Sequence, residues 1–305
     1  MKNNSLIQIL GTTSSGKSEL AVNLALSLQQ KGFRSLVISC DSRQVYKELD
    51  LGTGKIPGQH IFSEDLEVNI FCYRGIDHTL IDYIDLEQNY SLYQYLIDYL
   101  ELIERTKKKI DYYIITGGTG LYAKAIYEEY QVRSQEENND KDLEDYSTYS
   151  LKDLQQKLTQ SDFNNSDWHN SRRLITRIKN QNLTALQKLT HPNFLKKYKF
   201  AIKYDQEVIT DRIYKRIIER IQQGMLIEIE QVFIKYGYVR LVALGLEYKY
   251  GAYYYNGLIT EEEFVNLLYQ ATKKYTKRQL TWLKKEKDLI YINTLEDISN
   301  IICDK

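Results

Sequence analysis

The chain has 305 residues, with 41 basic and 41 acidic side chains and a formal net charge of zero. Apolar residues make up 43% and charged residues 27%, which is typical of a soluble globular protein with one large domain and an insertion, or with two domains. The three cysteines lie far apart without a C-x-x-C pair, which argues against a disulfide framework or a zinc site. We expect a cytoplasmic protein with no membrane segment, because no apolar run approaches about 20 residues.

The first element is a short apolar run from Leu6 to Leu10, which predicts a buried strand. Residues 11–18 then read GTTSSGKS and match the P-loop pattern G-x-x-x-x-G-K-[ST]. Apolar residues at helical spacing predict a helix that begins at Ser18 and stops at Gly32. In such a strand–loop–helix unit, backbone N–H groups and the helix N-terminus point at an anion. The expected diphosphate-binding residues are therefore Gly11, Thr12, Thr13, Ser14, Ser15, Gly16, Lys17 and Ser18, with the Ser18 hydroxyl as a candidate Mg²⁺ ligand.

The rest of the chain alternates strands with helices, which predicts an α/β fold: a P-loop NTPase-like parallel sheet flanked by helices. The predicted strands are residues 34–40, 111–116, 198–204 and 289–293; residues 56–75 are predicted to form a loop or hairpin; and the predicted helices are 92–105, one from about 121, 207–235 and 260–285. Residues 128–188 are polar and helical in pattern. We therefore expect a first part of the core at 1–127, a helical insertion domain at 128–188 and a second part of the core at 189–305.

A second candidate site begins at Asp41, directly after the strand predicted at residues 34–40. It lies at the carboxyl edge of the sheet, where α/β proteins bind ligands. An aspartate there can hold Mg²⁺ for nucleotide chemistry or can act as a general base on an acceptor, and position does not separate the two. The neighbours Ser42, Arg43 and Gln44 all form hydrogen bonds, and glutamine pairs well with an adenine edge.

Two later motifs carry further candidates. The stretch GGTGLY, residues 117–122, lets backbone approach a ligand closely and places the Thr119 hydroxyl at a helix N-terminus. The stretch TKKYTKRQLTW, residues 272–282, lies on the last long helix, with Arg278 and Gln279 on or beside its apolar stripe. Inward polar groups need partners, and arginine suits bidentate phosphate contact. A structural ion pair is the alternative for Arg278.

These four motifs, GTTSSGKS, DSRQVY, GGTGLY and KRQLTW, occur in an order that resembles the tRNA dimethylallyltransferase (isopentenylpyrophosphate transferase) family. Weaker matches are HTLID at 78–82, NSRRLI at 170–175 and ALGLEYK at 243–249, so the resemblance covers most of the chain. It implies that the diphosphate belongs to dimethylallyl diphosphate and not to ATP. It also implies transfer of the dimethylallyl group to N6 of an adenosine next to the anticodon of tRNA (position 37), with release of diphosphate.

The resemblance assigns roles to individual residues. Asp41 is the implied general base, Lys17 stabilises the leaving diphosphate, and Thr119 helps to hold the diphosphate or the Mg²⁺ cofactor. Lys273 and Arg278 complete the implied diphosphate site, although the family usually has arginine where this chain has Lys273. The implied contacts to the tRNA anticodon stem-loop are Asp41, Ser42, Arg43, Gln44, Arg172, Arg173, Arg177 and Gln279. In the insertion, the position at which the family has its second arginine is Thr176 in this chain, and Arg177 follows one residue later.

Three alternatives remain at this stage. A P-loop nucleotide or small-molecule kinase would need several lid arginines, but only Arg133 lies between Gly120 and the acidic stretch that follows. An adenylate (AMP) prenyltransferase would share the loop and Asp41 but would not need an RNA-gripping insertion or a basic C-terminal helix. A non-catalytic RNA-binding protein is disfavoured because Lys17, Ser18, Asp41 and Thr119 are all intact. We therefore expect a monomeric tRNA prenyltransferase.

Overall fold

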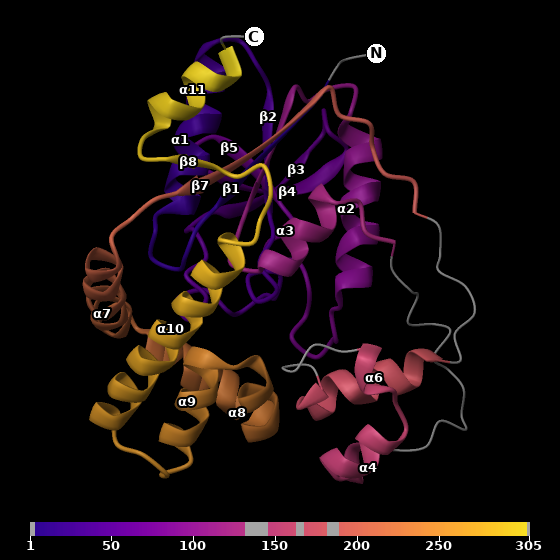
Figure 1. The fold of residues 1–305 in the computed structure, drawn as a ribbon. Coiled ribbons are helices and arrows are strands. Elements are labelled where there is room, and N and C mark those ends of the chain that lie inside the picture. Colours follow the sequence, from indigo (N-terminus) through magenta and orange to yellow (C-terminus); the bar gives the residue numbers. More distant parts are fainter. Residues whose placement is uncertain (1–3, 132–145, 163–167, 182–188, 304–305) are drawn as a thin grey trace. The chain divides into compact units, whose positions relative to one another are not determined.

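The computed structural model describes residues 4–131, 146–162, 168–181 and 189–303. Figure 1 shows its ribbon. The chain forms two compact units, which are a core unit of residues 1–129 and 191–305 and an insertion unit of residues 130–190. From the sequence, the helical insertion domain was expected at residues 128–188.

Within the described residues, the core unit holds one sheet of eight strands in the order β3-β4-β5-β2-β6-β1-β7-β8. Its strands are β1 (Ser5–Leu10), β2 (Ser35–Ser39), β3 (Gln59–Ser63), β4 (Val68–Tyr73), β5 (Ile76–Thr79), β6 (Tyr112–Thr116), β7 (Lys196–Ile202) and β8 (Ile290–Ile292). All pairs are parallel except β3 with β4 and β4 with β5. The predicted α/β fold is confirmed, and the segment expected as a loop or hairpin adds an antiparallel edge to the same sheet.

Helices cover both faces of the sheet (Figure 1). On one face α1 (Lys17–Gln30) and α11 (Leu295–Cys303) share a hydrophobic cluster with the central strands. On the other face lie α2 (Leu92–Thr106) and α3 (Gly120–Tyr127), joined by stacking of Tyr95 on Tyr122. The Gln8 side chain donates to the Ala123 carbonyl over 2.7 Å, which holds α3 against β1. Central strands buried on both faces explain their nearly continuous apolar sequences.

Four more helices form a lobe with a hydrophobic cluster of its own, which also includes Val45 and Leu49 from the loop after β2. They are α7 (Gln206–Gln222), α8 (Met225–Leu244), α9 (Leu246–Tyr255) and α10 (Glu261–Leu283). The prediction of one helix over 207–235 is wrong, because Gly224 has φ of 105°, a left-handed value that interrupts an α-helix. The sequence analysis also missed α9 and α11.

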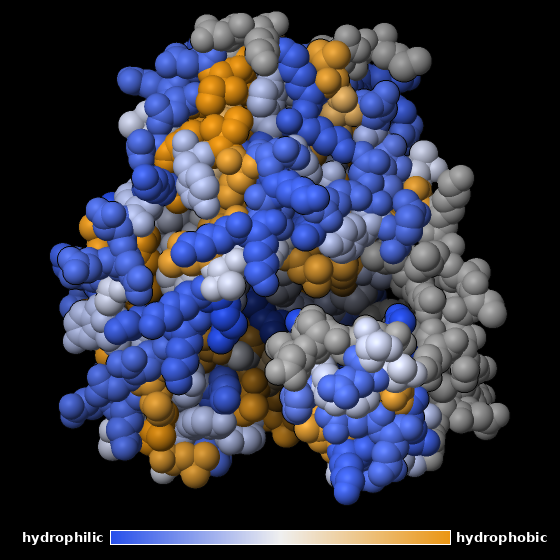
Figure 2. Space-filling view, viewed as in Figure 1, coloured by the Kyte–Doolittle hydropathy of each residue, from blue (hydrophilic) through white to orange (hydrophobic). Residues whose placement is uncertain are grey.

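The long helix α10 has a buried face toward the lobe and a hydrophilic outward face, which is blue in Figure 2. Beyond its C-terminus, the buried carboxylate of Glu286 accepts from the Lys199 ammonium on β7 over 2.9 Å. This buried pair connects the end of the helix to the sheet, since each charge needs its partner. Among the described helices, none has the length and apolar character needed to cross a bilayer.

The insertion unit contains α4 (Leu151–Gln156) and α6 (Ser171–Gln181), which pack around a small core of Leu154, Leu174 and Ile178. The Gln131 side chain accepts from the Leu189 N–H over 2.6 Å and donates to the Leu189 carbonyl over 3.2 Å. The segments that enter and leave this unit therefore lie side by side.

This arrangement predicts that the insertion unit can be removed. We expect replacement of residues 130–190 by a short Gly/Ser linker to leave a core that unfolds cooperatively, with a melting temperature lowered by no more than about 5 °C. The physical reason is that the core unit's two large hydrophobic clusters lie outside the insertion. Calorimetry, with pyrophosphate binding as the check on the P-loop, provides the measurement. A non-cooperative transition would show that the core depends on the insertion.

Candidate functional site

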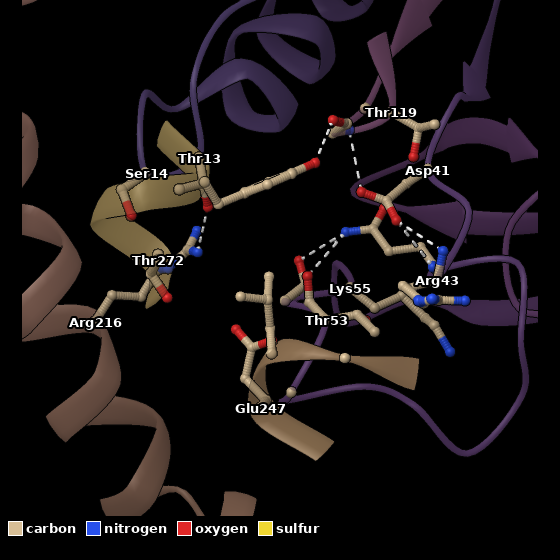
Figure 3. Close-up of a pocket in the computed structure, with 18 of the residues that line it drawn as sticks. Thr13, Ser14, Asp41, Arg43, Thr53, Lys55, Thr119, Arg216, Glu247 and Thr272 are labelled. Carbon is tan, nitrogen blue, oxygen red and sulfur yellow. Dashed lines mark hydrogen bonds between the residues drawn. The ribbon is translucent and has the colours of Figure 1, made fainter. Parts of the chain in front are cut away.

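Three loops that the sequence analysis identified separately meet in one cavity. They are residues 11–18 after β1, 41–44 after β2 and 117–120 after β6. The three strands are neighbours and run in the same direction, so their carboxyl ends share one edge of the sheet. The cavity at this edge has a volume of about 910 Å³, and α7, α9 and α10 supply further lining residues (Figure 3).

The P-loop contributes Thr13, Ser14, Gly16, Lys17 and Ser18 to the cavity lining. The turn beneath them is formed by Gly11, Thr12 and Ser15, where the Thr12 carbonyl accepts from Ser15 Oγ and Lys17 Nζ, both over 2.7 Å. Ser14 Oγ is buried and has no hydrogen-bond partner in the described structure. A buried hydroxyl without a partner is costly, so this loop is suited to an incoming anion that accepts from it.

A second cation, Arg216 of α7, reaches the P-loop and donates to Thr13 Oγ1 over 2.6 Å (Figure 3). Burial, and then the positive charge of Arg216, lower the pKa of the Lys17 ammonium to about 8. Burial, and then the neighbouring Arg220, lower the pKa of Arg216, although a guanidinium stays charged at neutral pH. This wall of the cavity is therefore strongly electropositive.

The sequence analysis missed Arg216 and Arg220. The available signal was their position, four residues apart on α7, at helical spacing from the buried Ile209 and Ile213. Charged side chains in an apolar stripe need buried partners. Arg278 on α10 shows the same pattern of a charged side chain on or beside an apolar stripe.

The carboxylate of Asp41 is held by backbone N–H groups from two loops. Its Oδ1 accepts from the N–H groups of Arg43 over 2.9 Å and Gln44 over 3.3 Å, and its Oδ2 accepts from Gly118 over 3.0 Å. A side chain at Gly118 would place its Cβ 2.6 Å from Asp41 Oδ2, so only glycine permits this approach. The Thr119 hydroxyl accepts from the backbone N–H of the residue after Asp41 over 2.9 Å, which joins the same two loops.

Helix α10 closes the cavity with residues from the KRQLTW motif. The buried Gln279 side chain accepts from the Thr13 N–H over 2.8 Å and donates to the Gly118 carbonyl over 3.1 Å, so it bridges two of the three loops. Tyr275 donates to the same carbonyl over 2.7 Å. Burial, and then the negative charge of Asp41, raise the pKa of Tyr275 to about 12, so this hydroxyl stays protonated as a donor.

The remaining predicted residues fall into three groups. Ser42, Arg43, Gln44 and Arg278 line the cavity with Asp41. Lys273 does not line it, because its ammonium lies over the Tyr269 ring at 4.9 Å from the centroid. The insertion-unit residues Arg173 and Arg177 are exposed on α6, and the side chains of Arg172 and Thr176 lie outside the described part. Contacts of all these residues with substrates stay predictions.

A carboxylate from α9 also lines the cavity and was not identified from sequence. Glu247 lies 3.7 Å from Arg220, with 14% of its side chain exposed. Burial raises the pKa of this carboxyl, and the positive charge of Arg220 lowers it. The two charges partly compensate each other inside the protein.

A P-loop, an aspartate and a glycine loop at neighbouring strand ends define an α/β protein built to place a phosphate-bearing ligand beside a carboxylate. The family model for IPP transferase matches residues 44–286, and the chain belongs to this family. It is 34% identical to tRNA dimethylallyltransferase 2 of Treponema denticola, over 96% of this chain and 95% of that protein.

Solved structures agree with this assignment. The tRNA delta(2)-isopentenylpyrophosphate transferase of Staphylococcus epidermidis superimposes with a TM-score of 0.66 and 25% identity, over 99% of this chain and 100% of that chain. A eukaryotic dimethylallyltransferase acting on tRNA superimposes with a TM-score of 0.70 and 19% identity, over 99% of this chain and 80% of that chain, which shows a shared fold.

The lowered pKa of Lys17 predicts a pH dependence of anion binding. The protonated ammonium attracts the anion, so affinity is full below a pKa of about 8 and falls as the pH rises through that value. We expect pyrophosphate affinity to decrease by up to about tenfold per unit above it. Titration calorimetry across this range provides the measurement. Lys17→Arg, which stays charged, is the control and should remove the slope, whereas a flat wild-type profile would contradict the assignment.

Proposed function

We propose that this protein transfers the dimethylallyl group of dimethylallyl diphosphate to N6 of the adenosine next to the anticodon (position 37) of tRNA and releases diphosphate. One observation carries the proposal: the Asp41 carboxylate faces the same cavity as Lys17 and Arg216 of the electropositive wall. Similarity to proteins named tRNA dimethylallyltransferase supports the transferred group and the acceptor.

The donor's diphosphate is expected to occupy the P-loop. The loop's backbone N–H groups, the Ser14 hydroxyl and the Lys17 and Arg216 cations can all donate to its oxygens. Negative charge increases on these oxygens as the bond between carbon and the diphosphate breaks. Fixed donors and cations in a buried site stabilise that charge without having to reorganise.

Mg²⁺ is the proposed cofactor. No group of three or more His, Cys, Asp or Glu side chains suited to a metal occurs in the described parts of the chain. Mg²⁺ usually retains several waters and binds through substrate phosphates with one or two protein ligands. The Ser18 hydroxyl lines the cavity beside Lys17, so the residues present fit such an ion. When bound, the ion would add positive charge against the leaving diphosphate.

The transfer itself needs a base on the acceptor. The lone pair of N6 forms a bond to C1 of the dimethylallyl group while the C1–oxygen bond breaks, and the diphosphate leaves with that electron pair. The N6 proton then passes to the Asp41 carboxylate. Its Oδ2 accepts a hydrogen bond from the Gly118 N–H and retains acceptor capacity for this proton.

The acceptor nucleotide must leave its stacked position to reach the cavity, as in other enzymes that modify a base. Its phosphates are expected to contact exposed basic residues, among them Arg177 on α6 and Lys274 and Lys277 on α10. Such contacts supply binding energy that weakens with salt. We propose a cytoplasmic monomer that acts on the anticodon stem-loop.

The function is tested by incubating the purified protein with labelled dimethylallyl diphosphate and Mg²⁺ in three reactions: with tRNA, with AMP and without an acceptor. We expect label in tRNA alone, because the insertion unit and the basic helix face serve an RNA and not a mononucleotide. Transfer to AMP without tRNA would identify an adenylate prenyltransferase. Phosphorylation of a small acceptor from ATP would identify a kinase.

Substitutions separate the two roles considered for Asp41. We expect Asp41→Asn to lower kcat by roughly 10²–10⁴-fold, the usual span for a general base, while donor affinity with Mg²⁺ stays near wild type. Ser18→Ala is the matched comparison and should weaken Mg²⁺-dependent donor binding. Single-turnover rates and donor titrations provide the measurements. An equal loss of donor affinity in both variants would make Asp41 a metal ligand.

A further inference from the structure

The Gln44 side chain has a fixed orientation at the cavity wall. Its amide nitrogen donates to two backbone carbonyls, Thr53 over 3.3 Å and Gly54 over 3.2 Å (Figure 3). A reversed amide would face two carbonyl oxygens with its own oxygen, which is repulsive. Both donors are therefore used inside the protein. The acceptor Oε1 accepts from the Ser39 hydroxyl over 3.4 Å, and its second lone pair remains for a ligand.

The loop that carries those carbonyls is held by one side chain from the helical lobe. The Glu228 carboxylate of α8 accepts from three consecutive backbone N–H groups, at Asp50 over 3.1 Å, Leu51 over 2.6 Å and Gly52 over 3.0 Å. It also accepts from the Tyr248 hydroxyl over 2.7 Å. Hydrogen bonds to an ionised acceptor are roughly twice as strong as neutral ones, so this contact fixes the turn firmly.

Two further contacts transmit this position to Gln44. Arg220 donates to the Gly52 carbonyl over 3.2 Å. Within the turn, the Gly54 N–H donates to the Leu51 carbonyl over 3.2 Å. A Cβ at Gly52 would lie 2.5 Å from the Tyr248 hydroxyl, so the turn packs directly on α9. The carbonyl directions at residues 53 and 54 therefore follow from the three N–H groups held by Glu228.

We propose that Glu228 is a positioning residue for acceptor selectivity. Through the turn at residues 50–54 it orients Gln44, which then offers only an oxygen to the acceptor base. This inference rests on the proposed function, because it concerns the base presented to Asp41. Two acceptors, Gln44 Oε1 and the Asp41 carboxylate, match the two protons of an exocyclic amine.

The arrangement selects a base by the polarity of its edge. The amine of adenine donates to Gln44 Oε1. Hypoxanthine carries an oxygen at the same position. It would leave the second lone pair of the half-buried Gln44 oxygen without a donor and facing another acceptor. Unsubstituted purine offers neither group. The expected order of affinity is therefore adenosine, then purine riboside, then inosine.

The test uses anticodon stem-loop RNAs with adenosine, purine riboside or inosine at the target position. Binding is measured at equilibrium with pyrophosphate and Mg²⁺ but without a prenyl donor, so that no RNA reacts. For the wild type we expect adenosine RNA to bind roughly tenfold more tightly than inosine RNA, the factor that one unmade buried hydrogen bond costs.

The decisive variant is Glu228→Gln, which keeps the shape but replaces one acceptor oxygen with a donor. We expect the ratio of inosine to adenosine dissociation constants to fall to about threefold or less, since a weakened turn no longer fixes the Gln44 amide. Glu230→Gln is the matched control, because it removes the same charge from an exposed position on the same helix. It should leave the ratio unchanged. Pyrophosphate affinity should be unchanged in both variants, whereas general destabilisation would lower it.

A milder variant keeps the inference testable if Glu228→Gln does not fold. Tyr248→Phe removes one of the four hydrogen bonds to Glu228, and we expect it to reduce the ratio part of the way. An unchanged ratio in the folded Glu228 variant, or in Tyr248→Phe if that variant is needed, would overturn the positioning role. Equal wild-type affinity for adenosine and inosine RNAs would overturn the role of Gln44. Failure of the wild-type protein to transfer label to tRNA would instead contradict the proposed function.

Discussion

The hydrogen bond from the Gly118 N–H to the Asp41 carboxylate is the contact on which the site depends. It exists because β2 and β6 are parallel neighbours, so the loops that follow them leave the sheet side by side. It also requires glycine, since a Cβ at residue 118 would lie 2.6 Å from Asp41 Oδ2. The pairing of β6 with β1 adds the P-loop to the same edge. Strand order thus brings together an anion-binding loop and a carboxylate.

Charge is divided across the cavity. Lys17 and Arg220 are buried at the cavity and Arg216 is half-buried there, while the carboxylates of Asp41 and Glu247 also line it. Buried like charges are unfavourable by themselves, and the lowered pKa values of the cations express that cost. In the proposed function, a bound diphosphate would supply the negative charge that these cations lack. Relief of their mutual repulsion would therefore contribute to the binding energy of the anion. In the proposed reaction, the same groups would face the charge that develops on the leaving diphosphate.

Side chains of the helical lobe hold loops of the cavity in place. Gln279 of α10 bridges the P-loop and the glycine loop, whereas Glu228 of α8 holds the turn that contacts Gln44. Donor-side and acceptor-side geometry are therefore set by different helices of one lobe. Because these helices share a single hydrophobic cluster, the two sides of the cavity are held in a fixed relation.

The P-loop, Asp41, the glycine loop and the KRQLTW segment could be predicted from the sequence, because each is a local pattern whose geometry follows from a few adjacent residues. The alternation of strands and helices could be predicted in the same way. Folding in three dimensions was needed to show that α7 ends before Gly224, that Arg216 and Glu228 reach the site, and that Arg278 lines the cavity while Lys273 does not. These outcomes depend on which face of a helix meets which loop. The periodicity of apolar residues predicts which face of a helix is buried. It does not predict which loop packs against that face, since this contact joins segments far apart in the sequence.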